Sequence, residues 1–186
     1  ALTGSVASAA SASVVAASKS SAFINACACA SCRRVCSASS LVNSAAVMER
    51  LPVEETSLAQ WDDILDLNLR APFFLAQQAA PHLRAVGGTI VNIADLSGFE
   101  PWRHYPAHSV SKAGVVMLTK VLASALAPEI TVNGIAPGTV LVPEDYDDAR
   151  RAFLSETTPL GRLGSPTDAV AALRFLVHQA PFVTGE

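Results

Sequence analysis

From residue 41 onward, short apolar runs alternate with longer stretches that have helical periodicity. The runs at 41–43, 88–94 and 130–136 have the length and composition of buried strands, while the stretches at 58–83 and 106–127 are long enough to be helices. Strands that are separated by helices of this length pair in parallel, because a parallel connection needs a dozen or more residues. The pattern predicts a single α/β domain built on a parallel sheet.

Two helix starts carry a complete capping signal. Ser57 is followed three residues later by Gln60, and Ser165 stands in the same relation to Asp168. In each pair the hydroxyl caps the first turn while the later side chain returns to the N-cap backbone. The sequence therefore predicts helices that begin directly after residues 57 and 165.

Pro72 falls inside the first long helical stretch. It lacks the N–H that would bond the carbonyl of Asn68, so a kink is predicted there. The carbonyl left without a donor has two interpretations, a simple bend or a place for a water molecule in a proton path.

Charge and hydropathy limit the kinds of partner. The formal net charge is -3 at pH 7, from 13 basic and 16 acidic residues, and no basic run is interleaved with aromatic residues, so a nucleic-acid partner is not expected. No uncharged apolar run of about 18 residues occurs outside an N-terminal part too polar to span a bilayer, so no membrane partner is expected either. A small-molecule substrate and a cytoplasmic location are the resulting expectations.

Residues 1–40 are dominated by Ala, Ser and Cys, unlike the rest of the chain. All four cysteines lie here, at Cys27, Cys29, Cys32 and Cys36, and their spacing fits no common zinc or iron–sulfur pattern. We expect no metal site, and a metalloprotein built on these cysteines is the most distant alternative. A Ser-rich, acid-poor start is also typical of a transit peptide, which stays open as a second interpretation.

Five polar residues recur at characteristic intervals in the well-patterned part of the chain. They are Asn43 at a strand end, Asn68 25 residues later, Asp95 27 residues after that, His108 13 residues further on and Lys112 four residues beyond it. These intervals resemble the strand-end asparagine, the helix asparagine, the serine, the tyrosine and the lysine of the short-chain dehydrogenase/reductase family. In this chain Asp stands in the serine position and His in the tyrosine position.

The resemblance implies a Rossmann-type, doubly wound parallel sheet in a single domain over residues 1–186. Residues 41–186 match the family well, whereas 1–40 look like a compressed form of the nucleotide-binding part. Gly4 stands in register with the first glycine of the family's phosphate-binding turn, but Ser8 and Ala10 occupy the other glycine positions. The last strand of the family is also not reached, so we expect the domain to be incomplete at both ends.

The resemblance further implies a nicotinamide cofactor, NADP with NAD as the alternative. The residues that it assigns to cofactor binding are Gly4, Asn43, Ala45, Lys112, Pro137, Gly138 and Val140. The residues that normally distinguish the two cofactors follow the second strand of such a fold, inside the compressed segment. The preference for NADP therefore comes from the resemblance alone.

The catalytic residues that the resemblance implies are Asn68, Asp95, His108 and Lys112. His108 and Lys112 are four residues apart on a helix, so they share one face. A histidine side chain ordinarily has a pKa of about 6.5, against about 10 for tyrosine, and exchanges protons readily at neutral pH. We expect His108 to be the proton donor; a hydroxyl from Tyr105, one helical turn earlier, and a nucleotide-binding or scaffold protein without catalysis are the alternatives.

An aspartate in the serine position resembles the pteridine reductase branch of the family. We therefore expect an oxidoreductase that reduces a carbonyl or imine of a small molecule, with a pteridine as the candidate, although Met48 stands where that branch has a stacking aromatic ring. Trp102 and Phe99 are candidates for the pocket wall. The segment 140–158 is expected to be a substrate lid.

Two further expectations concern charge and assembly. The acidic residues of the lid segment are interpreted as a solvated helix start; they are Glu144, Asp145, Asp147 and Asp148. Family members pair through the long helix that carries Lys112, so a homodimer or homotetramer is expected.

Overall fold

The computed structural model describes residues 39–142 and 146–186. In this part the sheet has three parallel strands in the order β1–β2–β3. They are β1 (Ser40–Asn43), β2 (Thr89–Ile93) and β3 (Thr131–Ile135). Val42 lies opposite Val91, and Val91 lies opposite Asn133 on the other side. The three predicted strands and their parallel pairing are confirmed, with ends that differ by at most one residue.

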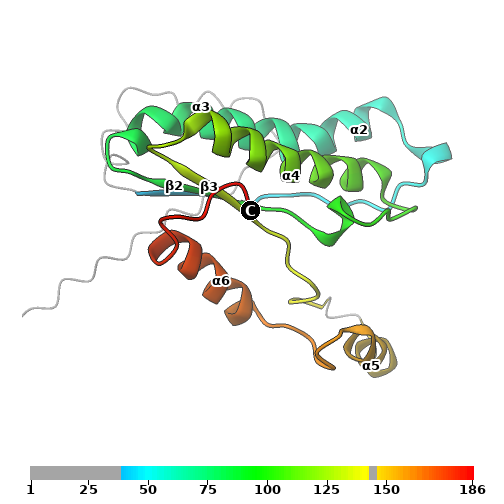
Figure 1. Ribbon diagram of the computed structural model, residues 1–186. Helices are drawn as coiled ribbons and strands as arrows, with labels where there is room; N and C mark the ends of the chain where they lie inside the picture. The colour runs from blue at the N-terminus through cyan, green and yellow to red at the C-terminus, as the bar shows by residue number, and fades with distance from the viewer. Residues whose placement is uncertain (1–38, 143–145) are drawn as a thin grey trace, which may run out of the picture.

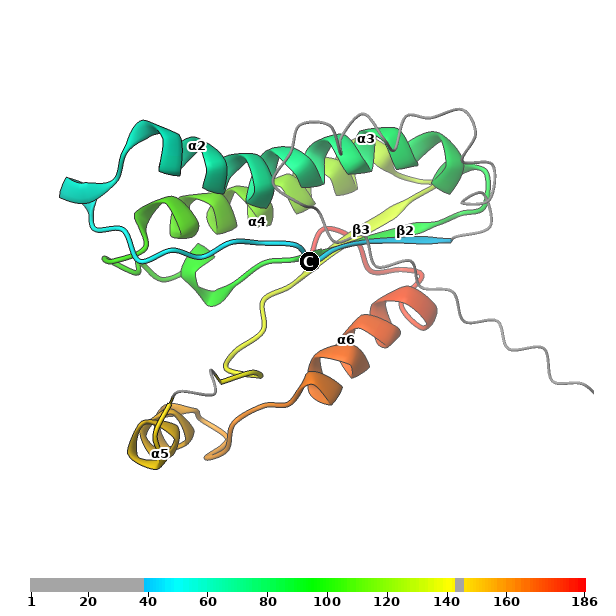
Figure 2. The ribbon, with the colours of Figure 1, turned by 180° about the vertical axis from the view of Figure 1, so that it is seen from behind.

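Helices cover both faces of this sheet. The helical elements are η1 (Val53–Glu55), α2 (Leu58–Leu65), η2 (Asp66–Arg70), α3 (Ala71–Arg84), η3 (Leu96–Gly98), α4 (Pro106–Leu126), α5 (Asp148–Thr157) and α6 (Pro166–His178). In Figure 1, α2, α3 and α4 lie on one face and α6 on the other, while α5 lies farther from the sheet. The reverse view in Figure 2 shows the same layers. The predicted doubly wound arrangement is confirmed for the described residues.

The first long helical stretch differs from its prediction. Between α2 and α3 the chain makes a π-helical turn over Asp66–Arg70, in which the N–H of Ala71 bonds to the carbonyl of Asp66. This one-residue slip places Pro72 in the first turn of α3, where a missing N–H is tolerated. The continuous α-helix predicted over this stretch is therefore interrupted by the π turn, whose extra residue accommodates the proline ring.

Small side chains let α3 and α4 approach the sheet closely. Ala76 and Ala80 of α3 and Ala123 of α4 are buried in one cluster with Ile90 of β2 and Val132 of β3. Burial of branched apolar side chains at such a contact is the main source of stability in a domain of this kind. The cluster fixes α4, and with it the residues of its first turns, against the strands.

The last residues of the chain run along β3. The N–H of Val132 donates to the hydroxyl of Thr184 at 3.0 Å, the N–H of Gly185 to the carbonyl of Val132 at 2.8 Å, and the N–H of Gly134 to the carbonyl of Glu186 at 2.6 Å. The C-terminus accordingly lies beside β3 in Figure 1. The edge of β3 that faces away from β2 is thus partly covered by this segment.

By length and a mean hydropathy of 1.3, α4 is the one helix of the described part that could cross a membrane. The core helix of a soluble protein passes the same test, and α4 packs against β3 and η3 and buries Lys112. A single helix of this kind is weak evidence for a membrane span.

Candidate active site

The four predicted catalytic residues come together where β2 ends and α4 begins. Asp95 follows β2, Asn68 lies in the π turn, and His108 and Lys112 lie in the first two turns of α4. His108 Nε2 is 4.0 Å from Asp95 Oδ2, and Asn68 Nδ2 is 3.4 Å from His108 Nδ1. The parallel sheet explains this convergence, because chain segments that leave its strands meet at one edge. Their catalytic roles stay predictions.

Asn68 is buried and holds the chain after β1 in place. Its Oδ1 accepts the N–H of Val47 at 2.8 Å, while its Nδ2 donates to the carbonyl of Val47 at 2.9 Å and to Ser111 Oγ at 3.0 Å. Ser111 Oγ in turn donates to the carbonyl of His108 at 2.7 Å. Sequence reasoning did not include Ser111 or the backbone of Val47 in the site.

Asp95 is the N-cap of η3, and its Oδ1 accepts the N–H of Ser97 at 2.7 Å. Partial burial acts to raise its pKa, but His108 and the N–H and hydroxyl of Ser97 outweigh burial and hold the pKa below the ordinary 3.8. Gly98 lets this turn touch α4, because a Cβ there would lie 3.0 Å from the carbonyl of Lys112. Asp95 is therefore an ionised carboxylate at neutral pH, fixed beside the start of α4.

Lys112 is buried, and its Nζ donates to the carbonyl of Ile93 at 2.8 Å. Burial lowers its pKa from the ordinary 10.5, and the Asp95 carboxylate offsets part of that shift. One of the three ammonium hydrogens is used by Ile93, so two remain to bind another acceptor at this site.

His108 is only 3% exposed, and its two ring nitrogens have different surroundings. Nδ1 is 3.1 Å from the carbonyl of Val47, whereas Nε2 has no hydrogen-bond partner among the described residues. The ring of Trp102 lies nearly parallel to the imidazole, at 23° and with 6.4 Å between ring centroids. Of the two predicted pocket aromatics, Trp102 thus touches the site, while Phe99 is 64% exposed.

Tyr105, the alternative proton donor, is the N-cap residue of α4. Its ring meets Trp102 edge-on, with 6.1 Å between centroids. Within the described residues no hydrogen bond joins its hydroxyl to Asn68, Asp95 or Lys112. Tyr105 therefore lies beside the cluster and is not bonded into it.

A buried chain of amides and a hydroxyl runs from β1 to α4 beside the cluster. Asn43 Nδ2 donates to Asn92 Oδ1 at 2.8 Å, and Asn92 Nδ2 donates to Thr119 Oγ1 at 2.9 Å. Asn43 Oδ1 has no partner in the described structure. Asn92 and Thr119 were missed at the sequence level, although an Asn inside the apolar run 88–94 was the available signal.

The remaining predicted cofactor residues lie at the same sheet edge. Ala45 follows β1, and Pro137, Gly138 and Val140 follow β3. The N–H of Gly164 donates to the carbonyl of Thr139 at 2.9 Å, which ties this loop to the segment before α6. Open space surrounds Gly138, since a Cβ there would meet nothing within 4 Å.

Several predicted residues lie outside the described part of the chain. They are Gly4, Cys27, Cys29, Cys32, Cys36, Glu144 and Asp145. Asp147 does cap α5, through a bond from the N–H of Arg150 to its Oδ1 at 2.7 Å, so that helix start is confirmed. Among residues 39–142 and 146–186, no group of three or more His, Cys, Asp or Glu side chains could hold a metal ion.

An open hollow lies where α2 and α4 begin. Its lining residues are Val53, Thr56, Ser57, Leu58, Trp61 and Pro106. None of the predicted site residues lines it, so the candidate site rests on the polar cluster and not on this hollow.

Comparison with known proteins agrees with this arrangement. A family model described as enoyl-(acyl carrier protein) reductase matches residues 4–186. The 2-dehydro-3-deoxy-D-gluconate 5-dehydrogenase of Escherichia coli is 36% identical over 147 residues, which are 75% of this chain and 58% of that protein. The 3beta-hydroxysteroid dehydrogenase 1 of Eggerthella lenta is 37% identical over 152 residues, 77% of this chain and 58% of its own length.

Solved structures match at the level of the fold as well. A Beutenbergia cavernae protein assigned as an NAD(P)-dependent gluconate 5-dehydrogenase, with NADP bound at low occupancy, superposes with a TM-score of 0.76 and 34% identity, covering 87% of this chain and 67% of that one. A 4-hydroxyisoleucine dehydrogenase complexed with NADH gives a TM-score of 0.76 and 30% identity, covering 88% and 71%.

Parallel strands, helices on both faces and a polar cluster at one sheet edge define a Rossmann-like α/β protein. The chain belongs to the short-chain dehydrogenase/reductase family. It spans about three fifths of the length of the curated relatives it matches. The relatives named above carry the names of sugar-acid and steroid dehydrogenases, so they give no specific support to the pteridine reductase branch.

Proposed function

We propose that this protein is an NADP(H)-dependent oxidoreductase that reduces a carbonyl or imine of a small molecule, with His108 as the proton donor. The observation that carries the proposal is His108 Nε2, a buried ring nitrogen without a hydrogen-bond partner in the described structure, 4.0 Å from the Asp95 carboxylate. When the ring carries both hydrogens, the one on Nε2 lies on the side of that carboxylate. Such a proton has no protein acceptor in hydrogen-bond reach and is available to a substrate oxygen or nitrogen.

The described residues fit the nicotinamide end of a dinucleotide. Two hydrogens of Lys112 and the unpartnered Asn43 Oδ1 offer donors and an acceptor beside the cluster, and the loop at Pro137–Val140 lies at the same sheet edge. NADP(H), when bound, would supply the hydride. Gly4, which lies outside the described residues, would bind its phosphates through its backbone N–H. NAD is the alternative cofactor.

Each side chain of the cluster has a separate task in this proposal. His108 protonates the substrate atom that becomes negative as hydride arrives at its neighbouring carbon. Asp95 stabilises the protonated imidazole, and Lys112 would hold the ribose of the cofactor through its remaining ammonium hydrogens. Asn68 positions the chain next to His108. Buried, preoriented groups of this type stabilise developing charge more strongly than water does.

The finer proposal for the substrate is a pteridine. It rests on Asp95 at the position where the pteridine reductase branch has an aspartate, and on Trp102 stacked against His108 as a platform for a flat ring. Met48 is 53% exposed and offers a weaker platform than an aromatic residue. Keto forms of sugar acids and of steroids are the competing substrates, since relatives with those names are similar to this chain.

The test begins with a fluorescence titration of the protein with NADPH, followed by loss of NADPH absorbance with a dihydropterin, a keto sugar acid, a ketosteroid, a quinone and a diketone. We expect binding, turnover of at least one substrate, and loss of turnover by a factor of about 100 or more in His108→Ala. Tyr105→Phe is the matched control, and it should retain turnover. Loss in Tyr105→Phe with activity kept in His108→Ala would transfer the donor role to Tyr105.

Two results would favour the alternative of a nucleotide-binding or scaffold protein. They are tight NADPH binding without turnover of any substrate, and an affinity for NADPH in His108→Ala equal to that of the wild type.

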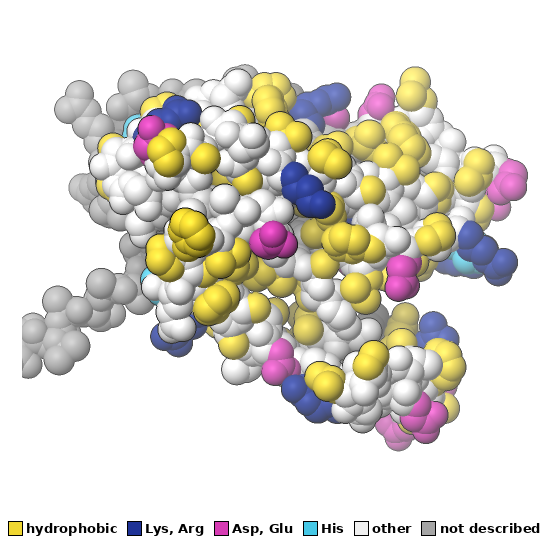
Figure 3. Space-filling view, in the orientation of Figure 1, with side chains coloured by type: hydrophobic (Ala, Val, Ile, Leu, Met, Phe, Trp, Pro, Cys, Tyr) yellow, Lys and Arg dark blue, Asp and Glu magenta, His cyan; other side chains and the backbone are white. Residues whose placement is uncertain are grey.

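For either function we propose a cytoplasmic homodimer or homotetramer. Exposed apolar side chains on α4 support self-association; they are Val110, Met117 and Val121. Figure 3 shows hydrophobic side chains on the outer surface formed by α3 and α4.

A further inference from the structure

We propose that Asn68 is a positioning residue that fixes the tautomer of His108, with the hydrogen on Nδ1, by clamping the backbone N–H and carbonyl of Val47. The assignment of Nε2 as the reacting nitrogen rests on the proposed function, whereas the tautomer itself does not. The argument is a count of hydrogens around one buried amide.

The orientation of the Asn68 amide is settled by its partners. The N–H of Val47 lies 2.8 Å from one end of the amide, so that end is the oxygen, which alone accepts. The other end is the NH₂ group, and it lies 2.9 Å from the carbonyl of Val47, which also only accepts. A flipped amide would face a donor with a donor and an acceptor with an acceptor.

Both hydrogens of this NH₂ group are taken. One goes to the carbonyl of Val47 and the other to Ser111 Oγ, at 3.0 Å. Ser111 accepts this bond because its own hydrogen is donated to the carbonyl of His108 at 2.7 Å. No hydrogen is left for the 3.4 Å contact between Asn68 Nδ2 and His108 Nδ1.

His108 Nδ1 must therefore carry a hydrogen itself. Its nearest acceptor is the carbonyl of Val47 at 3.1 Å, and a carbonyl can only accept. A bare Nδ1 would place its lone pair against that oxygen in a buried place, where an unmade hydrogen bond is costly. The neutral ring is thus the Nδ1–H tautomer, and the proton is gained and lost at Nε2, on the side of Asp95.

Asn68 is essential to this arrangement because its amide accepts from the N–H of Val47 and donates to the carbonyl of Val47, so the backbone on both sides of this residue is held. Val47 lies in an irregular segment after β1, where no strand or helix fixes its peptide plane. Without the clamp, that peptide can rotate, and the Nε2–H tautomer, which neutral histidine ordinarily prefers, becomes accessible. Nε2 would then no longer be the nitrogen that gains and loses the proton.

The experiment is long-range ¹H–¹⁵N NMR of the whole protein with ¹⁵N-labelled histidine, assigned with His108→Ala. At a pH where the imidazole is neutral, we expect a protonated Nδ1 and a bare Nε2 for His108 in the wild type. Asn68→Ala, which removes both bonds to Val47, should shift the ring toward Nε2–H. If the neutral His108 ring of the wild type carries its hydrogen on Nε2, the inference is overturned whether or not the variants fold.

Kinetics separate this inference from the proposed function. If the protein turns over a substrate, Asn68→Ala should lower kcat by up to about 100-fold with little change in KM, because ground-state binding is untouched while the donor is misplaced. A rise in KM of the same size, with kcat unchanged, would contradict a positioning role. A wild type that shows Nδ1–H but reduces none of the substrates supports the clamp and refutes the proposed function.

Discussion

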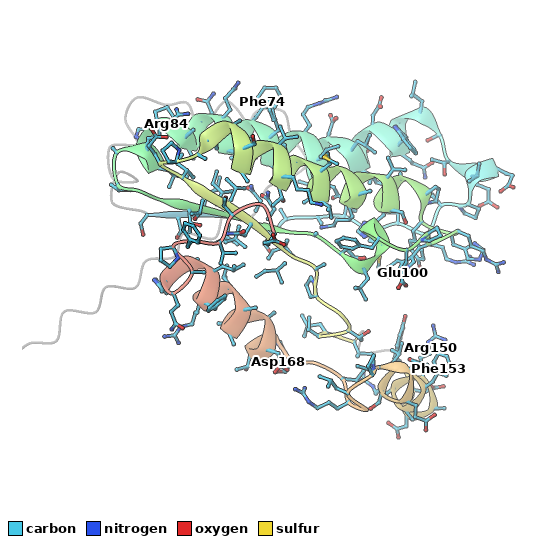
Figure 4. The ribbon with its side chains drawn as sticks, in the orientation of Figure 1. Phe74, Arg84, Glu100, Arg150, Phe153 and Asp168 are labelled. Atoms are coloured by element: carbon cyan, nitrogen blue, oxygen red, sulfur yellow. The ribbon has the colours of Figure 1, made fainter. Side chains whose placement is uncertain are left out.

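The part of the molecule that carries the candidate site and the part that follows β3 are built differently. Residues 39–135 contain the buried cluster between α3, α4 and the sheet, together with most of the buried polar side chains. In contrast, neither α5 nor α6 has a buried residue in the described structure. Figure 4 shows Arg150 and Phe153 side by side on α5, with the guanidinium 5.8 Å from the ring centroid, and Asp168 at the start of α6.

The difference lies in the range of the contacts. In the first region, side chains far apart in the sequence hold one another, as Asn43 and Asn92 do over 49 positions. In the second, long-range side-chain bonds are confined to the last residues beside β3, and those at α5 and α6 are local, such as the bond from the N–H of Ser165 to Asp168. A region held by distant contacts is expected to unfold as one unit, whereas locally held helices open separately at lower cost. Four predictions test this comparison.

The largest effect is expected for Ile90→Ala. Ile90 is fully buried at the centre of the first region, so its truncation should lower the free energy of unfolding by about 2–5 kcal/mol. Val170→Ala on α6 is the control, because Val170 is 50% exposed and should change the same quantity by less than about 0.5 kcal/mol. Urea unfolding curves measure both, and equal losses would remove the distinction between the regions.

The next effect is expected for Asn92→Ala, which breaks the polar chain between β1 and α4. It leaves Asn43 Nδ2 and Thr119 Oγ1 without their buried partner, so we expect a loss of about 1–3 kcal/mol in the free energy of unfolding. Asn43→Ala in the Asn92→Ala background should cost less than Asn43→Ala alone, since the two residues share one bond. Strict additivity in this double-mutant cycle would show that their bond contributes nothing.

These long-range pairs also mark the limit of what the sequence can predict. The strands, α4 and both capping boxes follow from local pattern, and the resemblance of the intervals between Asn68, Asp95, His108 and Lys112 to those of the family implied that they would meet. The contact between Val47 and His108 spans 61 positions. It uses a backbone carbonyl, and because every residue has one, the sequence could not predict this contact. The π turn was missed for a related reason. Pro72 predicts that the regular helix is disturbed, but it does not predict which backbone conformation accommodates the proline.

A third prediction concerns acid pH and is confined to the first region. Because the folded-state pKa of Asp95 is below 3.8, its ionised form contributes stability above that pH, and the contribution is lost as pH falls through the folded-state pKa. In Asp95→Asn this part of the acid dependence should be absent, while the pKa of Lys112 should fall further because its neighbouring carboxylate is gone. Unfolding free energies of both proteins across acid pH test this, and parallel curves would contradict it.

The smallest effect compares one substitution in both regions. Ser57 and Ser165 head equivalent capping boxes on α2 and α6, so replacing either by Ala should weaken its helix by about 1 kcal/mol. We expect Ser57→Ala to lower the global free energy of unfolding, because α2 buries Ile64 and continues into the turn that carries Asn68. Ser165→Ala should instead speed amide exchange within α6 and leave exchange in β2 and α4 unchanged, since α6 lies across the sheet from the buried cluster between α3, α4 and the strands. If Ser165→Ala speeds exchange in β2 as much as in α6, then α6 is part of the same folding unit as the site, and the contrast between the two regions is wrong.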